Sequence, residues 1–105
     1  MGYYSTFEVL ETDISDIEDV LNSFSEMKWS GSPGFEYWGG RLNSRDSTKW
    51  YDWLTDLDEI AKLYPSNYLI MERAGEESPD ISRAVIKHGK VTETRVCLAR
   101  STVIQ

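Results

Sequence analysis

Two segments of the chain repeat apolar residues at the three- and four-residue spacing of an amphipathic helix. The first begins at Asp13 or Ser15, either of which can cap a helix, and ends near Met27. Its apolar side consists of Ile14, Ile17, Val20, Leu21 and Phe24. Acidic residues near its start suit the positive end of the helix dipole. We therefore expect a helix that buries one face in this segment.

The second helical segment follows Asp52, a candidate N-cap, and ends before Pro65, which cannot continue a helix. Its apolar side consists of Trp53, Leu54, Leu57, Ile60, Ala61 and Tyr64. The helical spacing can also be extended back to Trp50, but residues 47–51 alternate polar and aromatic side chains and equally suit the end of a strand. We interpret this region as a strand that leads into a helix.

Alternation of polar and apolar residues predicts strands in the remaining segments. We expect a first strand over residues 3–11, with Phe7 and Val9 facing the core. A hairpin follows, formed by residues 35–38 and 47–51. Its turn lies at Gly39-Gly40 or within the polar run Asn43 to Asp46, since both sequences favour turns.

The last third of the chain predicts three more strands, over residues 67–73, 81–87 and 91–98. His88-Gly89-Lys90 is a short turn between the last two, in which Gly89 can supply the positive φ that tight hairpins need. Residues 99–105 have the composition of a short edge strand.

The resulting order is strand, helix, strand, strand, helix, strand, strand, strand. We expect an α+β fold whose first six elements form a ferredoxin-like two-layer sandwich, an antiparallel sheet with two helices on one face. The last two strands would extend that sheet as a C-terminal β-hairpin. A length of 105 residues fits a single domain spanning 1–105.

Charge narrows the range of partners. The chain has 18 acidic and 11 Lys plus Arg residues, for a formal net charge of −7. Such a balance opposes binding to nucleic acid phosphates or to anionic membranes and favours a basic partner. No apolar run approaches bilayer length and the first residues do not resemble a signal peptide, so we expect a cytoplasmic protein.

Candidate chemistry is sparse, and we expect no enzyme activity, no cofactor and no metal. His88 has no Ser or Cys partner nearby in sequence, and Cys97 is a single cysteine flanked by apolar residues. The glycine pairs around residues 31–34 and 39–41 lack the lysine and following helix of a phosphate-binding loop. The acidic segment 76–80 lacks the ligand periodicity of a calcium loop and is interpreted as an exposed turn.

Four short motifs occur in order along the chain, Lys49-Trp50-Tyr51-Asp52, Leu63-Tyr64-Pro65, Gly75-Glu76-Glu77-Ser78-Pro79-Asp80-Ile81 and Gly89-Lys90-Val91. With its Tyr-rich start, the chain resembles a group of small, mostly uncharacterised bacteriophage proteins. It departs from them at Arg83 to Ile86, where a more aromatic strand is expected, and at residues 43–48. The resemblance implies a ferredoxin-like fold and a mobile-element setting, and it implies no catalytic residue.

The leading hypothesis is a non-enzymatic protein of phage or mobile-element origin that blocks a host protein with a basic surface. An anti-defence inhibitor, such as an anti-CRISPR protein, is its sharpest form. The candidate partner-binding residues are acidic and lie in the second helix and in the loop at 76–80; they are Asp52, Asp56, Asp58, Glu59, Glu76, Glu77 and Asp80.

Two other function classes are weighed beside it. A single-stranded nucleic-acid binder would stack bases on aromatic side chains beside arginines, with the candidates Tyr37, Trp38, Arg41, Arg45 and Tyr68. A small enzyme would need His88 beside a carboxylate in a pocket. A homodimer is possible if the edge at residues 101–105 extends a sheet between two copies.

Overall fold

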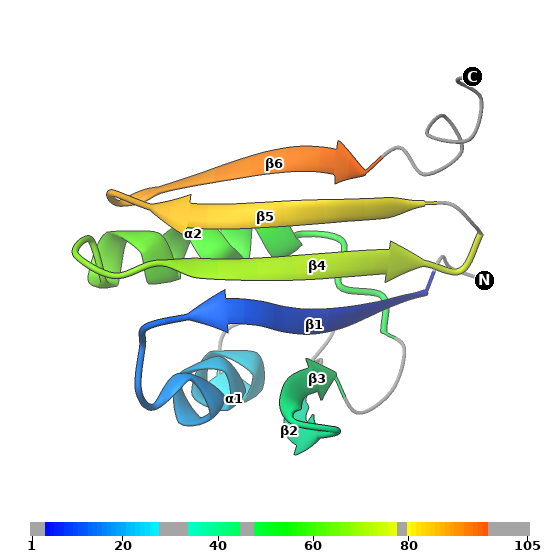
Figure 1. Cartoon of the computed structure of the whole chain (residues 1–105), viewed down its shortest axis with the longest axis horizontal. Coiled ribbons are helices and arrows are strands. Elements are labelled where there is room, and N and C mark those ends of the chain that lie inside the picture. Colours follow the sequence, from blue (N-terminus) through cyan, green and yellow to red (C-terminus); the bar gives the residue numbers. More distant parts are fainter. Residues whose placement is uncertain (1–3, 28–33, 45–47, 78–79, 97–105) are drawn as a thin grey trace.

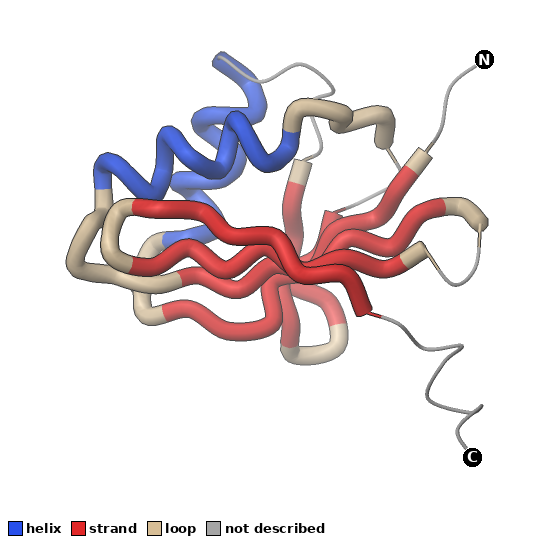
Figure 2. The backbone as a smooth tube through the Cα atoms, turned by 90° about the horizontal axis from the view of Figure 1, so that it is seen from above, coloured by secondary structure: helices blue, strands red, loops and turns tan. Residues whose placement is uncertain are grey.

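The computed structural model describes residues 4–27, 34–44, 48–77 and 80–96. Within these ranges the protein is an α+β fold of two helices and a six-stranded antiparallel sheet (Figure 1). The elements are β1 (Ser5–Thr12), α1 (Ile17–Met27), β2 (Phe35–Trp38), β3 (Arg41–Ser44), α2 (Trp53–Leu63), β4 (Leu69–Gly75), β5 (Ile81–Lys87) and β6 (Lys90–Val96). Figure 2 shows both helices on the same side of the sheet, which leaves the opposite face without a helix.

The strand order in the sheet is β2-β3-β1-β4-β5-β6, and every neighbouring pair is antiparallel. The central pairing joins β1 and β4, from Ser5 opposite Gly75 to Thr12 opposite Leu69, with a bulge between Val9 and Glu11. The β5–β6 hairpin continues the sheet beyond β4. β1 and β4, which are far apart in the sequence, therefore form the middle of the sheet.

The hydrophobic core lies between the sheet and the two helices. Alternate residues of β1, Ser5, Phe7 and Val9, are buried, as the pleat of a strand requires. From α2, Trp53, Leu57, Ile60 and Ala61 are buried at helical spacing. We call the face of the sheet that carries these contacts the covered face, and the other the open face.

Trp50 is buried in the core just before α2. Its ring packs edge-on against Phe7, with the centroids 4.9 Å apart, and against Phe35 at 6.3 Å. Such tilted aromatic pairs are favourable beyond the area that they bury. The aromatic segment before α2 therefore anchors the helix to the centre of the sheet.

The predicted strand over residues 47–51 is wrong, because the returning strand of the hairpin is β3 at Arg41–Ser44. Gly39 and Gly40 form the turn, with φ of 65° and 84°. A two-residue turn with positive φ at both positions matches the twist of a hairpin, so the chain reverses there at once. Thr48 pairs with Ser5 in an isolated antiparallel bridge and belongs to none of the described strands.

The other elements lie close to their predicted positions. The turn between β5 and β6 is confirmed at His88 and Gly89, whose φ values are 54° and 75°, while Lys90 belongs to β6. Asp52 directly precedes α2, but its side chain makes no cap hydrogen bond. Residues 28–33, 45–47 and 97–105 lie outside the described ranges, and with them Trp29, Arg45, Cys97 and the predicted edge strand. Neither described helix is long and apolar enough to cross a bilayer.

Candidate functional site

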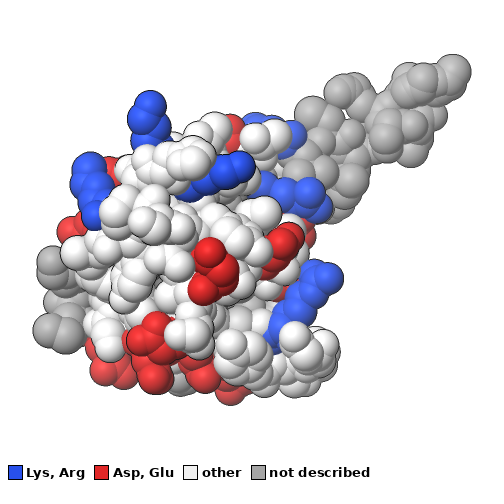
Figure 3. Space-filling model, turned by 60° about the vertical axis from the view of Figure 1, so that its left-hand side comes forward, with Lys and Arg blue, Asp and Glu red and all other residues white. Residues whose placement is uncertain are grey.

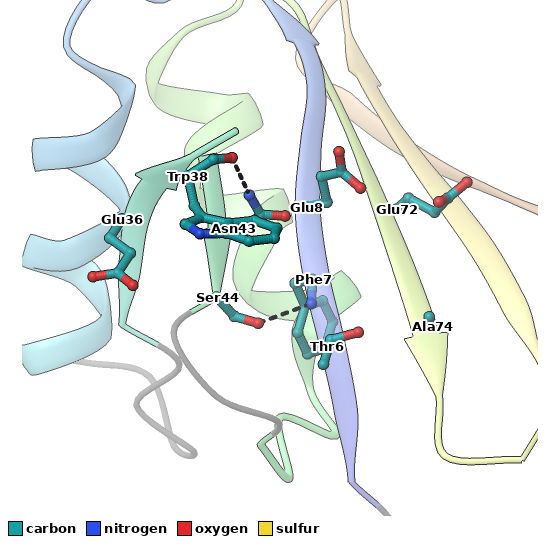
Figure 4. A pocket seen from close by; sticks show the side chains of 9 residues that line it. All are labelled: Thr6, Phe7, Glu8, Glu36, Trp38, Asn43, Ser44, Glu72 and Ala74. Carbon is teal, nitrogen blue, oxygen red and sulfur yellow. Dashed lines mark hydrogen bonds between the residues drawn. The ribbon is translucent and has the colours of Figure 1, made fainter. Parts of the chain in front are cut away.

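The open face of the sheet contains a hollow of about 380 Å³ between the β2–β3 hairpin and the two central strands (Figure 4). It is lined by Thr6, Phe7, Glu8, Glu36, Trp38, Asn43, Ser44, Glu72 and Ala74. The register of β1 and β3 covers only Glu8 opposite Asn43 and Val9 opposite Leu42. Beyond these pairs the Phe7 N–H donates to the side-chain hydroxyl of Ser44, 3.0 Å away. The hollow therefore opens where the backbone ladder between these strands stops.

Trp38 is the most exposed large hydrophobic side chain of the described chain, at 75%. It lies opposite Arg41 beside the tight turn of the hairpin. The Asn43 amide donates to the main-chain oxygens of Trp38 and Arg41, at 3.2 and 2.9 Å, and so fixes the backbone that carries the indole. A large aromatic side chain held in solvent on a rigid hairpin has the properties of an interface anchor.

A row of polar side chains crosses the open face beside this hollow. The registers place Asn43 opposite Glu8, Glu8 opposite Glu72, and Glu72 opposite Arg83. Arg41 pairs with Glu8 and Arg83 with Glu72, each at 2.9 Å. Both arginine side chains are about half exposed, so these are surface ion pairs, each worth about 0–1 kcal/mol.

A second hollow of about 300 Å³ adjoins the first. Its lining consists of Tyr4, Ser5, Thr6, Ala74, Gly75 and Glu76. Thr6 and Ala74 line both hollows, so together they form one depression along β1 and β4, which we call the open-face furrow. At this end the Glu76 carboxylate accepts the Tyr4 N–H at 3.3 Å, and the Lys49 ammonium lies 5.3 Å from the centre of the Tyr4 ring.

The predicted acidic partner-binding residues do not form one cluster. Only Glu76 lines the furrow. Asp80 lies between two guanidinium groups, those of Arg73 and Arg95, at 2.9 Å from each. Asp58 pairs with Lys62 one helical turn later. Two of the predicted acidic residues are therefore neutralised by the protein's own basic side chains.

Asp56 is turned toward the core from α2. Its carboxylate accepts the Trp50 Nε1–H at 2.6 Å. Partial burial raises the pKa of Asp56, the Trp50 hydrogen bond partly offsets that rise, and the charges of Asp52 and Glu59 add to it. The other predicted acidic residues are exposed: Asp52 just before α2, Glu59 within α2, and Glu77 after β4.

The predicted nucleic-acid residues are also divided. Trp38 and Arg41 lie side by side on the open face, whereas Tyr37 alternates to the covered side, opposite Leu42. The Tyr68 hydroxyl donates to the Glu11 carboxylate at 2.9 Å, and this hydrogen bond is the main cause of a raised pKa for Tyr68. The structure therefore brings two of the five together, and Arg45 lies outside the described residues.

Sequence reasoning did not select Glu8, Glu36, Glu72 or Tyr4 for the site. Their alternation within strands signals that they point away from the core, but the signal that groups them is the register of strands far apart in the chain.

Figure 3, a view of one side of the molecule, shows acidic side chains gathered toward α1 and most basic ones toward the β5–β6 edge.

Within the described ranges, no three or more His, Cys, Asp or Glu side chains are grouped so that they could hold a metal ion. His88 is exposed in its turn and lines neither part of the furrow.

No protein-family model, no curated protein and no solved structure matches this chain. The arrangement offers an anchoring aromatic, carboxylates and a shallow concave surface, which together suit binding.

Proposed function

We propose that this protein is a non-enzymatic binding protein of phage or mobile-element origin that blocks a host protein in the host cytoplasm. The sharpest form of the proposal is an anti-defence inhibitor, such as an anti-CRISPR protein, that occupies a basic surface of its target. The observation that carries the proposal is the open face of the sheet, where Trp38 stands in solvent beside a hollow lined by three glutamates.

The physical basis is anchoring combined with charge. Interfaces draw much of their affinity from a few buried aromatic or arginine side chains surrounded by a polar rim. Trp38 supplies such an anchor, and Glu8, Glu36 and Glu72 supply the polar surroundings. The net charge of −7 would speed encounter with a positively charged partner.

We place the proposed contact surface on the sheet and not on α2. Asp58 and Asp80 are paired within the protein, so they contribute little charge to a partner. The contact surface that we propose is therefore centred on the open face and Glu76, on the side of the sheet that α2 does not cover.

The fold that we propose for the first six elements is the ferredoxin-like sandwich, with β5 and β6 as an added hairpin. The order β2-β3-β1-β4, all antiparallel, and the position of both helices on one side support it. In such a fold the helices leave one sheet face available, which is the face that carries Trp38.

The test is capture of the target from a host lysate, followed by reconstitution with the purified target. We expect the captured protein to have a basic surface and to lose its nucleic-acid binding as this protein is added. Charge reversal at Glu72 together with Glu76, which line the open-face furrow, should weaken the inhibition, while reversal at Asp58 on α2 should change it little. Failure to inhibit any captured protein would refute the proposal.

A single-stranded nucleic-acid binder is the second candidate, because Trp38 and Arg41 are adjacent on the open face. Binding to oligonucleotides that weakens steeply with salt would favour it over the first candidate.

A further inference from the structure

We infer that the open-face furrow binds an extended cationic segment of a partner protein, with one Arg or Lys side chain against Trp38 and a second beside Glu76. This inference rests on the proposed function, since the segment belongs to the protein that would be blocked. It adds the place of contact and the chemistry of the ligand.

Charge identifies the occupant. Four carboxylates line the furrow, those of Glu8, Glu36, Glu72 and Glu76, and none of its lining residues is a lysine or an arginine. Glu8 and Glu72 are directly opposite each other on neighbouring strands. Like charges in that position are unfavourable. Arg41 and Arg83 each pair with one of these carboxylates, and a cation placed between the two would offset the repulsion that remains.

The internal ion pairs do not block the furrow. Arg41 and Arg83 each reach one of these glutamates from the side, and their side chains are 55% and 47% exposed. A carboxylate has acceptor sites for more than one donor, so a partner guanidinium can bind beside either arginine or displace it. Displacing a surface pair costs at most about 1 kcal/mol.

The exposed aromatic residue at one end supports a cationic ligand independently of the carboxylates. Trp38 presents an exposed indole, and tryptophan is the best aromatic partner for a cation. At the other end the protein already places the Lys49 ammonium over the Tyr4 ring. A partner cation would repeat at Trp38 the contact that Tyr4 makes within the chain.

The geometry also sets the spacing of the cationic residues. The two hollows share Thr6 of β1, and together they extend along the chain from Tyr4 to Glu8. Four residues of a strand span about 13 Å. An extended ligand that follows β1 would therefore place its two cationic side chains about four residues apart.

The test uses an NMR titration of the isotopically labelled full chain with a Gly/Ser peptide that carries two arginines four residues apart, at low salt. We expect the signals of Trp38 and Glu72 to shift, and binding to weaken as salt is added. Trp38→Ala and Glu72→Gln should each weaken binding about two- to fivefold, since a cation–π or ion contact at an exposed site is worth about 0.5–1 kcal/mol.

Two variants serve as matched controls. Tyr37→Ala removes an exposed aromatic from the same strand on the opposite side, and Glu93→Gln removes one negative charge from β6, away from the furrow. Both should bind the peptide as the wild type does. Equal losses in these controls, or no binding by the wild type, would overturn the inference.

Arg41→Gln distinguishes a cationic ligand from a nucleic acid at the same surface. Without Arg41, Glu8 loses its internal partner, so the arginine peptide should bind about two- to fivefold more tightly, in line with the modest worth of a surface pair. An oligonucleotide would bind less well to this variant. Unchanged or weaker peptide binding contradicts the inference.

The failure of this inference can be separated from that of the proposed function. If a captured host protein binds Trp38→Ala and Glu72→Gln as well as the wild type, the furrow is the wrong place while the proposed function stands. If the peptide binds as expected and no host protein is inhibited, the furrow stands and the proposed function fails.

Discussion

The two faces of the sheet treat their charged side chains in different ways. On the covered face, Arg73 is enclosed, with its side chain only 13% exposed and its guanidinium 6.0 Å from the centre of the Trp53 ring. It donates to Asp80 and to the hydroxyls of Ser5 and Ser82. On the open face, Glu8 and Glu72 make one surface pair each and border a hollow.

This difference separates structural charges from available ones. Asp80 is held by Arg73 of β4 and by Arg95 of β6, so its charge is used to tie these strands together at the start of β5. Glu72 lies one residue before Arg73 in β4, yet the pleat turns it to the other face. Neighbouring charged residues in one strand can therefore have opposite roles, one in folding and one in binding.

The largest effect that tests this contrast is expected from Asp80→Asn. The change leaves the enclosed Arg73 without a charged partner, and losing one partner of such a pair should lower the free energy of unfolding by about 3 kcal/mol. Urea denaturation of the wild type and the variant measures it. A loss below about 1 kcal/mol would show that the covered-face charges are not structural.

A smaller effect is expected from Arg95→Ala, the outer member of the same group. Its side chain is 60% exposed, and Arg73 still holds Asp80 when it is gone. We expect a loss of about 0.5–1 kcal/mol in the same denaturation assay. A loss as large as that of Asp80→Asn would mean that exposure does not separate the two arginines.

The sequence predicted the positions of helices and strands more accurately than it predicted which strands and side chains are neighbours in space. Apolar spacing located both helices, and alternation located β1, β5 and β6, because these patterns are local. The error at residues 47–51 arose because polar and aromatic residues alternate there, although Trp50 belongs to the core and the Gly39-Gly40 turn had already closed the hairpin. Local pattern cannot tell a strand from an irregular segment that buries one aromatic ring.

The candidate site was less predictable for a related reason. Acidity along the chain selected Asp80, which the fold neutralises with arginines from β4 and β6. The same criterion passed over Glu8 and Glu72, which become neighbours only through the pairing of β1 with β4. Charge in a sequence gives the sign of a surface, and strand register decides which charges share it.

The burial of Asp56 is intermediate between that of the enclosed charges on the covered face and that of the exposed charges on the open face. Its carboxylate lies on α2 and is partly buried beside Trp50. Its pKa in the folded protein is raised above the ordinary 3.8, so the native state holds the proton more tightly than the unfolded state does. This contribution to stability is fully present below pH 3.8 and is lost as the pH rises through the folded-state pKa.

Asp56→Asn should remove that dependence, since an amide has no charge to desolvate and can still accept the Trp50 N–H. We expect the variant to gain stability relative to the wild type as the pH rises above 3.8, with a constant difference at neutral pH. Urea midpoints across this range measure it. A difference that does not change with pH would place Asp56 with the fully exposed charges.

The smallest effect on folding, and the sharpest test of the contrast, is expected from Glu72→Gln. This change removes one surface pair with Arg83, and it also removes the repulsion between Glu72 and Glu8 across the β1–β4 pairing. The two contributions have opposite signs and similar size, so the free energy of unfolding should change by less than about 0.5 kcal/mol. The same change should weaken binding of the arginine peptide about two- to fivefold. A residue that is neutral for folding and important for binding is what the open face predicts. If Glu72→Gln instead destabilises the protein as Asp80→Asn does, the charges on both faces serve the fold, and the distinction between the faces is lost.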